Sequence, residues 1–302
     1  MKRNILKAGR SSLAISIPKI FVQSNNLSQG QEITVECHGP TMIATCGTPS
    51  KSIKKIDLQH LKPDTESRIL DKILGVLFKQ GADTYEIMLP NQSLKAKMRG
   101  ILRDGKLNMY EEPSGSHDTS IIIHSPIKNY DETTLEQMAA VIIKNLFVTL
   151  EEFVDLLSRN ELTDSAVEEM VSRDRVINDN SDICRRMINQ NIADYKSTSW
   201  YVFVDKCEKM GDLLKNMILF AKSRPELTRK NINQFDNITN CLYMLFSGTS
   251  NFNTKKMDSF FSACDAASKD VESCKDLHLY YYLKSLLTLI RDAYSDILIR
   301  NM

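Results

Sequence analysis

The feature that most constrains the fold is a series of long apolar stripes between residues 131 and 302. Apolar residues recur there at steps of three and four, which is the spacing of one face of an α-helix. The first stripe comprises Leu135, Met138, Ile142, Leu146, Leu150, Phe153 and Leu157, and five more follow it. Stripes of this length bury their apolar faces against one another in helical bundles. We therefore predict two successive three-helix units, residues 131–224 and 229–302, which form an internal repeat of roughly 80–90 residues.

Residues 1–47 have the pattern of a small β-domain. We predict short strands over residues 13–17, 32–37 and 41–45, with a brief helix from Pro18 to Asn26. Turn signals separate these elements at Ser28-Gln-Gly30 and at Gly39-Pro40. Because strands this short bury little apolar surface alone, such a unit needs a partner chain. The sequence therefore predicts a homodimer that forms through residues 1–47.

The middle of the chain has two parts. Residues 48–64 are rich in Lys, Ser and Pro, and we interpret them as a linker. Residues 65–125 combine helix patterns over 66–79 and 92–102 with a strand over 85–89 and paired strands over 106–111 and 119–124. The predicted fold class is thus multidomain and mainly α, with a small β-domain, a small α/β segment and two three-helix units.

The charge of the chain is almost balanced, with a formal net charge of +1 over 302 residues. Nucleic-acid binding would therefore depend on a local basic patch. The first domain supplies such a patch, whose members are Lys2, Arg3, Lys7, Arg10 and Lys19. These five residues are the candidate DNA-binding residues.

The sequence also indicates a compartment. The N-terminus has no apolar signal-peptide segment, and no uncharged apolar run reaches the ~18 residues that a membrane span requires. The seven cysteines are an odd number and form no Cys-x-x-Cys pair, which is typical of reduced thiols in a packed core. We expect a cytoplasmic protein without a membrane span.

Motifs of common enzyme classes are absent from the sequence. No Glu-x-x-His, Gly-x-Gly-x-x-Gly or Gly-x-Ser-x-Gly occurs, and no Gly-x-x-x-x-Gly-Lys is followed by the Ser or Thr that a phosphate-binding loop requires. The five histidines are dispersed, and Cys37, His38 and Cys46 would offer three zinc ligands without a fourth. We predict that the chain is not an enzyme.

Acidic residues interrupt the apolar stripes of the first three-helix unit. Asp174 occupies a core-facing position, while Glu208 and Asp212 lie one helical turn apart beside Gly211. Two carboxylates at this spacing can bind a hard divalent cation, and a buried carboxylate requires a metal, an Arg or a Lys nearby. Asp174, Glu208 and Asp212 are therefore candidate metal ligands, with salt bridges as the alternative. We interpret Gly211 as a close contact between helices.

The N-terminal residues resemble a known domain. The order Leu13-Ala-Ile-Ser-Ile-Pro-Lys19 followed by Asn26-Leu-Ser-Gln-Gly-Gln-Glu-Ile-Thr-Val35 is similar to the AbrB/SpoVT swapped-hairpin domain. Gln31 stands where that family usually has an acid after the glycine. The resemblance implies an intertwined dimer whose basic loops can face DNA.

Residues 131–302 resemble a PhoU bundle of two three-helix repeats. Ser172-Arg-Asp-Arg-Val-Ile-Asn178 and Glu208-Lys-Met-Gly-Asp212 are similar to its acidic motifs, while the second repeat has Thr288-Leu-Ile-Arg-Asp292. The resemblance implies that any divalent metal (Mg, Mn, Zn or Fe) lies in the first repeat. Together with the first domain and the α/β segment, the order resembles archaeal phosphate-uptake regulators.

Two functions follow from these resemblances. The first is a DNA-binding regulator of phosphate uptake and phosphate homeostasis, in which the helical bundle is a sensor or a docking module. The second is a dimeric adaptor that does not bind DNA and acts on a phosphate ABC transporter ATPase or a signalling protein.

Overall fold

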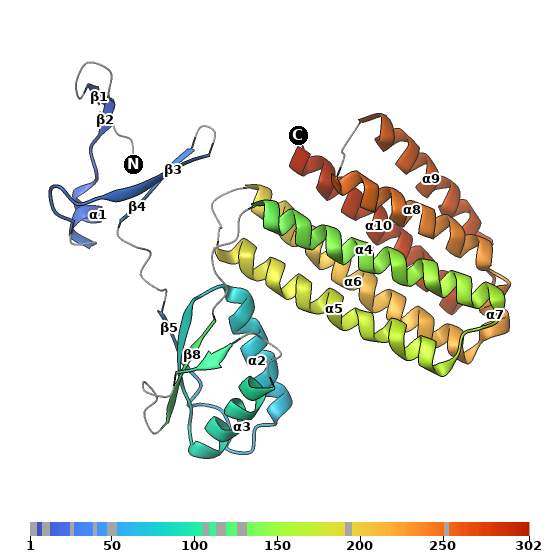
Figure 1. The fold of residues 1–302 in the computed structure, drawn as a ribbon, viewed down its shortest axis with the longest axis horizontal. Coiled ribbons are helices and arrows are strands. Elements are labelled where there is room, and N and C mark those ends of the chain that lie inside the picture. Colours follow the sequence, from blue (N-terminus) through green and yellow to red (C-terminus); the bar gives the residue numbers. More distant parts are fainter. Residues whose placement is uncertain are drawn as a thin grey trace. The chain divides into compact units, whose positions relative to one another are not determined.

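The computed structural model describes residues 5–7, 13–24, 27–38, 41–46, 53–104, 109–112, 119–125, 132–190, 195–250 and 254–301. The chain divides into two compact units, Met1–Lys54 and Lys55–Met302 (Figure 1). The chain is mainly helical, as the apolar stripes predict, and it has a small mixed sheet in addition. No described helix has both the length and the apolar character needed to cross a membrane.

The first unit contains two small antiparallel sheets. Strand β1 (Ile5–Lys7) pairs with β2 (Leu13–Ile15), and β3 (Ile33–His38) pairs with β4 (Thr41–Cys46). Helix α1 (Lys19–Ser24) follows β2 after Pro18. The predicted strands and short helix are therefore present, and β1 precedes them.

The second unit begins with a small sheet that is covered by two helices. Four strands lie in the order β5-β6-β8-β7: β5 (Ile53–Asp57), β6 (Thr84–Met88), β7 (Tyr110–Glu111) and β8 (Ser120–His124). The predicted antiparallel pairing of the last two strands is confirmed, with Glu111 opposite Ile123. The sheet packs on α2 (Ser67–Gln80) and α3 (Gln92–Arg103) through the buried residues Tyr85, Ile87, Ile121, Ile123, Leu70, Leu74, Leu94 and Met98.

The structure places strand β5 inside the segment that the sequence indicates as a linker. Lys54 and Lys55 separate its only isoleucines, Ile53 and Ile56, so the alternation typical of a half-buried strand is missing. The strand forms because the edge of the sheet beside β6 supplies backbone partners, and that edge is not visible in the local sequence.

The helical bundle contains six long helices and one short one among the described residues. Their bounds are α4 (Glu132–Arg159), α5 (Asp164–Gln190), α6 (Tyr195–Ser223), α7 (Pro225–Arg229), α8 (Ile232–Ser250), α9 (Thr254–Glu272) and α10 (Leu277–Asn301). The six long helices correspond to the six predicted stripes, and their buried side chains form one continuous core.

Corresponding helices of the two halves pair with one another. Within the first half α4, α5 and α6 pack together, and within the second half α8, α9 and α10 pack together. The halves meet where α4 packs on α8 and α6 packs on α10 (Figure 1). First helix therefore meets first helix, and third meets third.

Candidate functional site

Helices α5 and α6 approach closely at the acidic seam that the sequence singles out. A Cβ atom added to Gly211 would lie 3.3 Å from Ile177 Cγ2 and 3.4 Å from Asp174 Oδ1. The prediction that Gly211 is a helix–helix contact is confirmed. Asp174 is buried at this contact, with 8% of its surface exposed.

A lysine lies between two of the three candidate metal ligands. Lys215 Nζ donates to Asp174 Oδ2 at 2.6 Å and lies 3.4 Å from Asp212 Oδ1. The hydrogen bond to Asp174 raises the pKa of Lys215 above its ordinary value, so the ammonium form is favoured. Asp174 and Asp212 are thus joined by one shared cation.

The third candidate, Glu208, belongs to a different cluster. Its carboxylate accepts from Arg185, whose side chain is only 6% exposed. Arg185 also lies 3.2 Å from an oxygen of Asp205 and 3.3 Å from one of Asp182. The structure therefore separates Glu208 from the Asp174–Asp212 pair.

Within the described ranges, no group of three or more His, Cys, Asp and Glu residues is arranged to hold a metal ion. The salt bridges of Asp174, Asp212 and Glu208 are the alternative that the sequence left open. Metal binding stays a prediction, and it would require Lys215 to move away from Asp174.

Three oxygen atoms of α5 nevertheless remain available for a ligand. Asp174 Oδ1, Asn178 Oδ1 and Ser181 Oγ are buried on one helical stripe and have no hydrogen-bond partner in the described part of the chain. Buried oxygen atoms of this kind are ordinarily satisfied by water or a cation. The stripe is therefore the part of this seam best suited to accept one.

The second half has a different arrangement at the comparable position. Arg291 Nη1 donates to Asp265 Oδ1 at 2.9 Å, and Thr288 Oγ1 donates to the backbone oxygen of Lys284. At the place of Gly211 the second half thus has an arginine that forms an ion pair, and fewer metal ligands there stays a prediction.

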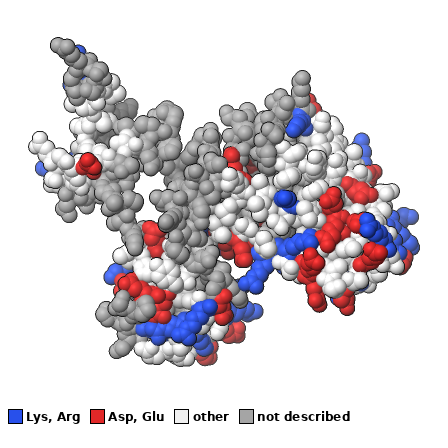
Figure 2. All heavy atoms as spheres, in the orientation of Figure 1, with Lys and Arg blue, Asp and Glu red and all other residues white. Residues whose placement is uncertain are grey.

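Two of the five candidate DNA-binding residues are described. Lys7 ends β1 and Lys19 begins α1, and both side chains are exposed. Lys2, Arg3 and Arg10 lie outside the described residues. On the face of the molecule shown in Figure 2, Lys and Arg side chains of the bundle are intermingled with Asp and Glu. This face of the bundle presents no extended surface of one sign.

The structure also shows a junction that sequence reasoning missed, between α2 and the end of α5. Arg186 is fully buried and donates to the backbone oxygens of Phe78 at 3.0 Å and Ala82 at 3.1 Å. Asn189 and Gln190 donate to the oxygens of Lys79 and Gly81. These α5 side chains donate to carbonyl groups at the C-terminal end of α2, where the Gly81 N–H also donates to the oxygen of Phe78.

Gly81 is required at this junction for two reasons. Its φ of 82° is in the left-handed region, and an added Cβ would lie 3.0 Å from Gln190 Cγ. The sequence contains the glycine as a helix-ending signal. It contains no local signal for partners about a hundred residues away, because capping by distant side chains leaves no periodic pattern.

The five cysteines of the helical bundle are free thiols, as the sequence indicates. Cys184, Cys207, Cys241 and Cys264 are buried and Cys274 is partly buried. Burial raises the pKa of Cys184 to about 12, so its thiolate form is suppressed at neutral pH.

Comparison with protein-family models, curated proteins and solved structures finds no match for this chain.

Proposed function

We propose that this chain is a dimeric regulator of phosphate uptake and phosphate homeostasis. Residues 1–47 dimerise and bind DNA, and the helical bundle is the sensor or docking module. The proposal includes no enzymatic activity. The link to phosphate rests on the resemblance of residues 131–302 to PhoU bundles.

The observation that carries the proposal is the exposed apolar surface of the first unit. Ile5 is 67% exposed and Leu13 is 71% exposed on the β1–β2 hairpin, and Ile20 of α1 is 71% exposed. Leu6, Ile15, Ile17 and Val35 are exposed as well. Burying one large apolar side chain contributes about 1.5–3 kcal/mol, so this surface favours association.

A second copy of the chain is the partner that fits this surface best. The first unit has two separate two-stranded sheets, and a single two-stranded hairpin is marginally stable in water. Two copies can cover each other's apolar strands and complete a common core. Dimerisation also doubles the number of basic side chains available to DNA.

The arrangement of the bundle supports the proposed internal repeat. The pairing of α4 with α8 and of α6 with α10 is what two copies of one three-helix unit produce when they pack about an approximate two-fold axis. Two acidic seams at equivalent places then have unequal ligand sets, with the first seam richer in oxygen atoms.

The DNA-binding role is tested by salt dependence on a random-sequence duplex. Each phosphate contact contributes about 0.9 to the slope of log affinity against log salt. We expect Lys7→Ala combined with Arg10→Ala to weaken binding at low salt and to flatten this slope. Lys256→Ala combined with Lys269→Ala, both exposed on α9, removes the same charge and is the matched control.

Fluorescence anisotropy and light scattering on the same samples separate the two functions. A dimer that binds DNA, with a slope reduced in the first double variant and kept in the control, supports the regulator. A dimer that does not bind DNA at low salt supports the adaptor, which would act on a phosphate transporter ATPase or a signalling protein. A monomer at micromolar concentration contradicts both.

A further inference from the structure

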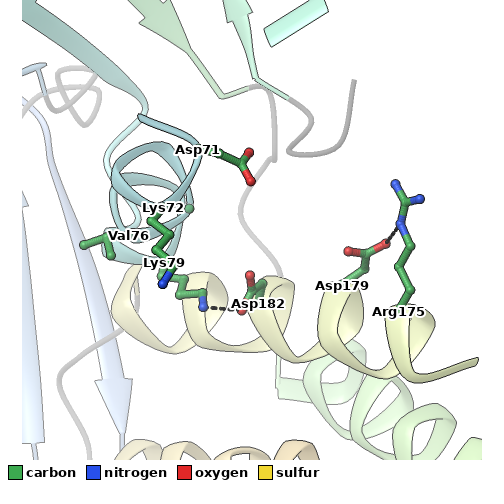
Figure 3. A pocket seen from close by; sticks show the side chains of 8 residues that line it. Asp71, Lys72, Val76, Lys79, Arg175, Asp179 and Asp182 are labelled. Atoms are coloured by element: carbon green, nitrogen blue, oxygen red, sulfur yellow. Dashed lines mark ion pairs between the residues drawn. The ribbon is translucent and has the colours of Figure 1, made fainter. Parts of the chain in front are cut away.

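Helices α2 and α5 enclose a hollow beside their junction. Its volume is about 400 Å³, and its walls are formed by charged side chains of both helices (Figure 3). Asp71, Lys72 and Lys79 come from α2, and Arg175, Asp179 and Asp182 come from α5. This volume lies in the range of small-molecule sites, which often occur where two substructures meet.

Gly75 keeps the hollow open. It lies in the interior of α2 and lines the hollow, and a Cβ atom added to it would meet nothing within 4 Å. No close helix packing therefore requires a glycine here, although glycine inside a helix costs about 0.5–1 kcal/mol relative to alanine. The effect of the glycine is space beside Val76 at the wall of the hollow.

The charges of the hollow are only partly neutralised by one another. Lys79 Nζ lies 2.8 Å from Asp182 Oδ1, whereas Arg175 Nε is 4.0 Å from Asp179 Oδ2. Asp71 and Lys72 form no ion pair with any described residue. In Figure 3, Asp71 extends from α2 toward the space that Asp179 and Asp182 face from α5.

Asp179 is an acid of the hollow that a positively charged ligand would stabilise in its ionised form. Partial burial raises its pKa, and nearby Asp182 acts in the same direction while Arg175 opposes them. An ammonium group between Asp71 and Asp179 would favour the ionised carboxylate. The guanidinium of Arg175, which lies beside Asp179, is then placed to attract a negatively charged group.

The mixture of positive and negative side chains that line the hollow limits which class of ligand can bind there. A simple anion would be repelled by three carboxylates, and an apolar compound would find Val76 as the only large apolar side chain among the lining residues. No described acidic group is arranged for a single metal ion. A molecule with separated charges of both signs matches the lining.

We propose that this hollow binds a zwitterion of the amino-acid class, whose ammonium group lies between Asp71 and Asp179 and whose carboxylate faces Arg175. This inference is independent of dimerisation and DNA binding by residues 1–47. The proposed ligand binds at the junction of the α/β segment and the bundle.

The test uses the full-length protein and titration calorimetry with L-leucine and the dipeptide glycyl-L-leucine. Because exposed ion pairs contribute only about 0.2–1 kcal/mol each, titrations extend to about 10 mM. N-acetyl-L-leucine lacks the ammonium group and L-leucinamide lacks the carboxylate. We expect at least one zwitterion to bind, and each blocked compound to bind at least about tenfold more weakly, as the loss of about 1.4 kcal/mol implies.

Gly75→Leu fills the hollow without removing a charge, and we expect it to reduce zwitterion affinity at least tenfold. Gly100→Leu is its matched control, because Gly100 also lies in a helix with open space at its Cβ position but does not line the hollow. Both variants place a strong helix former in a helix and should retain or raise the thermal midpoint.

Asp179→Asn tests the charge separately, with Asp258→Asn on exposed α9 as its control. A tenfold loss of zwitterion affinity in Asp179→Asn, with no loss in Asp258→Asn, supports the site. The proposal is overturned if neither zwitterion binds the parent protein, if a blocked compound binds equally well, or if Gly75→Leu and Asp179→Asn both bind like the parent. None of these results depends on DNA binding or on the oligomeric state.

Discussion

Several charged side chains in the interior of the bundle are held in pairs between neighbouring helices. Lys215 on α6 joins Asp174 on α5, and Lys206 on α6 joins Asp296 on α10 at 2.7 Å. Removing one member of such a pair leaves the other charge buried without compensation. These pairs therefore give direct tests of what the acidic seam does.

Replacing Lys215 by Met distinguishes the two accounts of the acidic seam. Without its ammonium group, Asp174 and Asp212 face each other unneutralised, and we expect a loss of about 2–4 kcal/mol in metal-free buffer. If the seam binds a cation, Mn²⁺ or Mg²⁺ will restore the lost stability in this variant more than in the parent. Thermal midpoints with and without each metal measure this effect.

Lys209→Met is the control for this experiment, because Lys209 is exposed on the same helix and pairs with Asp205. If Lys215→Met loses thermal stability to the same extent with and without metal, salt bridging is the complete explanation of the seam. Equal stability of Lys215→Met and the parent without metal would contradict both accounts.

The Lys206–Asp296 pair predicts a pH dependence. Burial raises the pKa of Asp296, Asp292 acts in the same direction, and Lys206 opposes them. The native state thus binds the proton of this carboxyl more tightly than the unfolded state does. Its contribution to stability is present at low pH and is lost as pH rises from about 3.9, the unfolded value, through the native pKa.

We expect Asp296→Asn to remove this trend while keeping an oxygen acceptor for Lys206. The unfolding free energy of the parent should fall relative to that of the variant as pH rises from about 4 to 7, by about 1.4 kcal/mol for each tenfold difference in proton affinity. Urea unfolding across this pH range is the measurement. Parallel pH profiles, or a parent that gains stability relative to the variant, would contradict it.

At the level of secondary-structure elements, α5 is the helix that joins the α/β segment to the bundle. It packs on α4 and α6 through one face, and its last turns contact α2. Ile183 of α5 packs against both hydrophobic cores of the second unit. The two substructures are therefore connected by a continuous set of contacts.

Arg186→Met tests the main contact of this junction. It removes the guanidinium donor from the carbonyl oxygen of Ala82 and leaves that of Phe78 with the Gly81 N–H alone, and a buried carbonyl left unpaired costs about 1–3 kcal/mol. We expect a loss of about 2–4 kcal/mol and faster amide hydrogen exchange around residues 78–83. Arg175→Met, on an exposed part of the same helix, should change stability by less than about 0.5 kcal/mol. Unchanged exchange around residues 78–83 would show that other contacts hold the junction.

Elements with a strong repeating pattern could be predicted from the sequence. The six bundle helices, α2, α3 and the β7–β8 pair all follow apolar spacing or clear turn residues. Strand β5 and the short helix α7 could not, because β5 depends on a sheet edge and α7 has only five residues. Local pattern is insufficient where a distant partner decides the structure.

The candidate sites show the same limit. The positions of Asp174 and Gly211 at the α5–α6 seam follow from helical spacing, but the choice of partner for each acid does not. Glu208 turns to Arg185 and Asp212 turns to Lys215, although the two acids lie one turn apart on the same helix. Arg185 belongs to α5, whereas Lys215 belongs to the same helix as Asp212, and which of these partners an acid contacts is set by packing, which spacing alone does not reveal.

At the level of the whole molecule, the first unit should determine the oligomeric state. Leu13→Lys places a charge on the exposed apolar hairpin, and we expect it to shift the solution mass from dimer toward monomer because a charge would be buried in the interface. Val141→Lys, on an exposed apolar position of α4, is the matched control and should remain dimeric. Light scattering over a range of concentrations measures both, and a dimeric Leu13→Lys would assign the interface to another surface.

The junction between α2 and α5 has a consequence for biosynthesis. The backbone oxygen of Phe78 receives its side-chain donor from a residue 108 positions later in the chain, and that of Ala82 from the same residue, 104 positions later. At about 5–20 residues per second, a ribosome needs roughly 5–20 seconds to add the intervening residues. During that interval the end of α2 has only the local Gly81 cap and lacks its side-chain donors from α5, and one face of α2 is uncovered. The α/β segment therefore reaches its final stability only after α5 has emerged from the ribosome. Chaperones can bind the uncovered face of α2 during this interval.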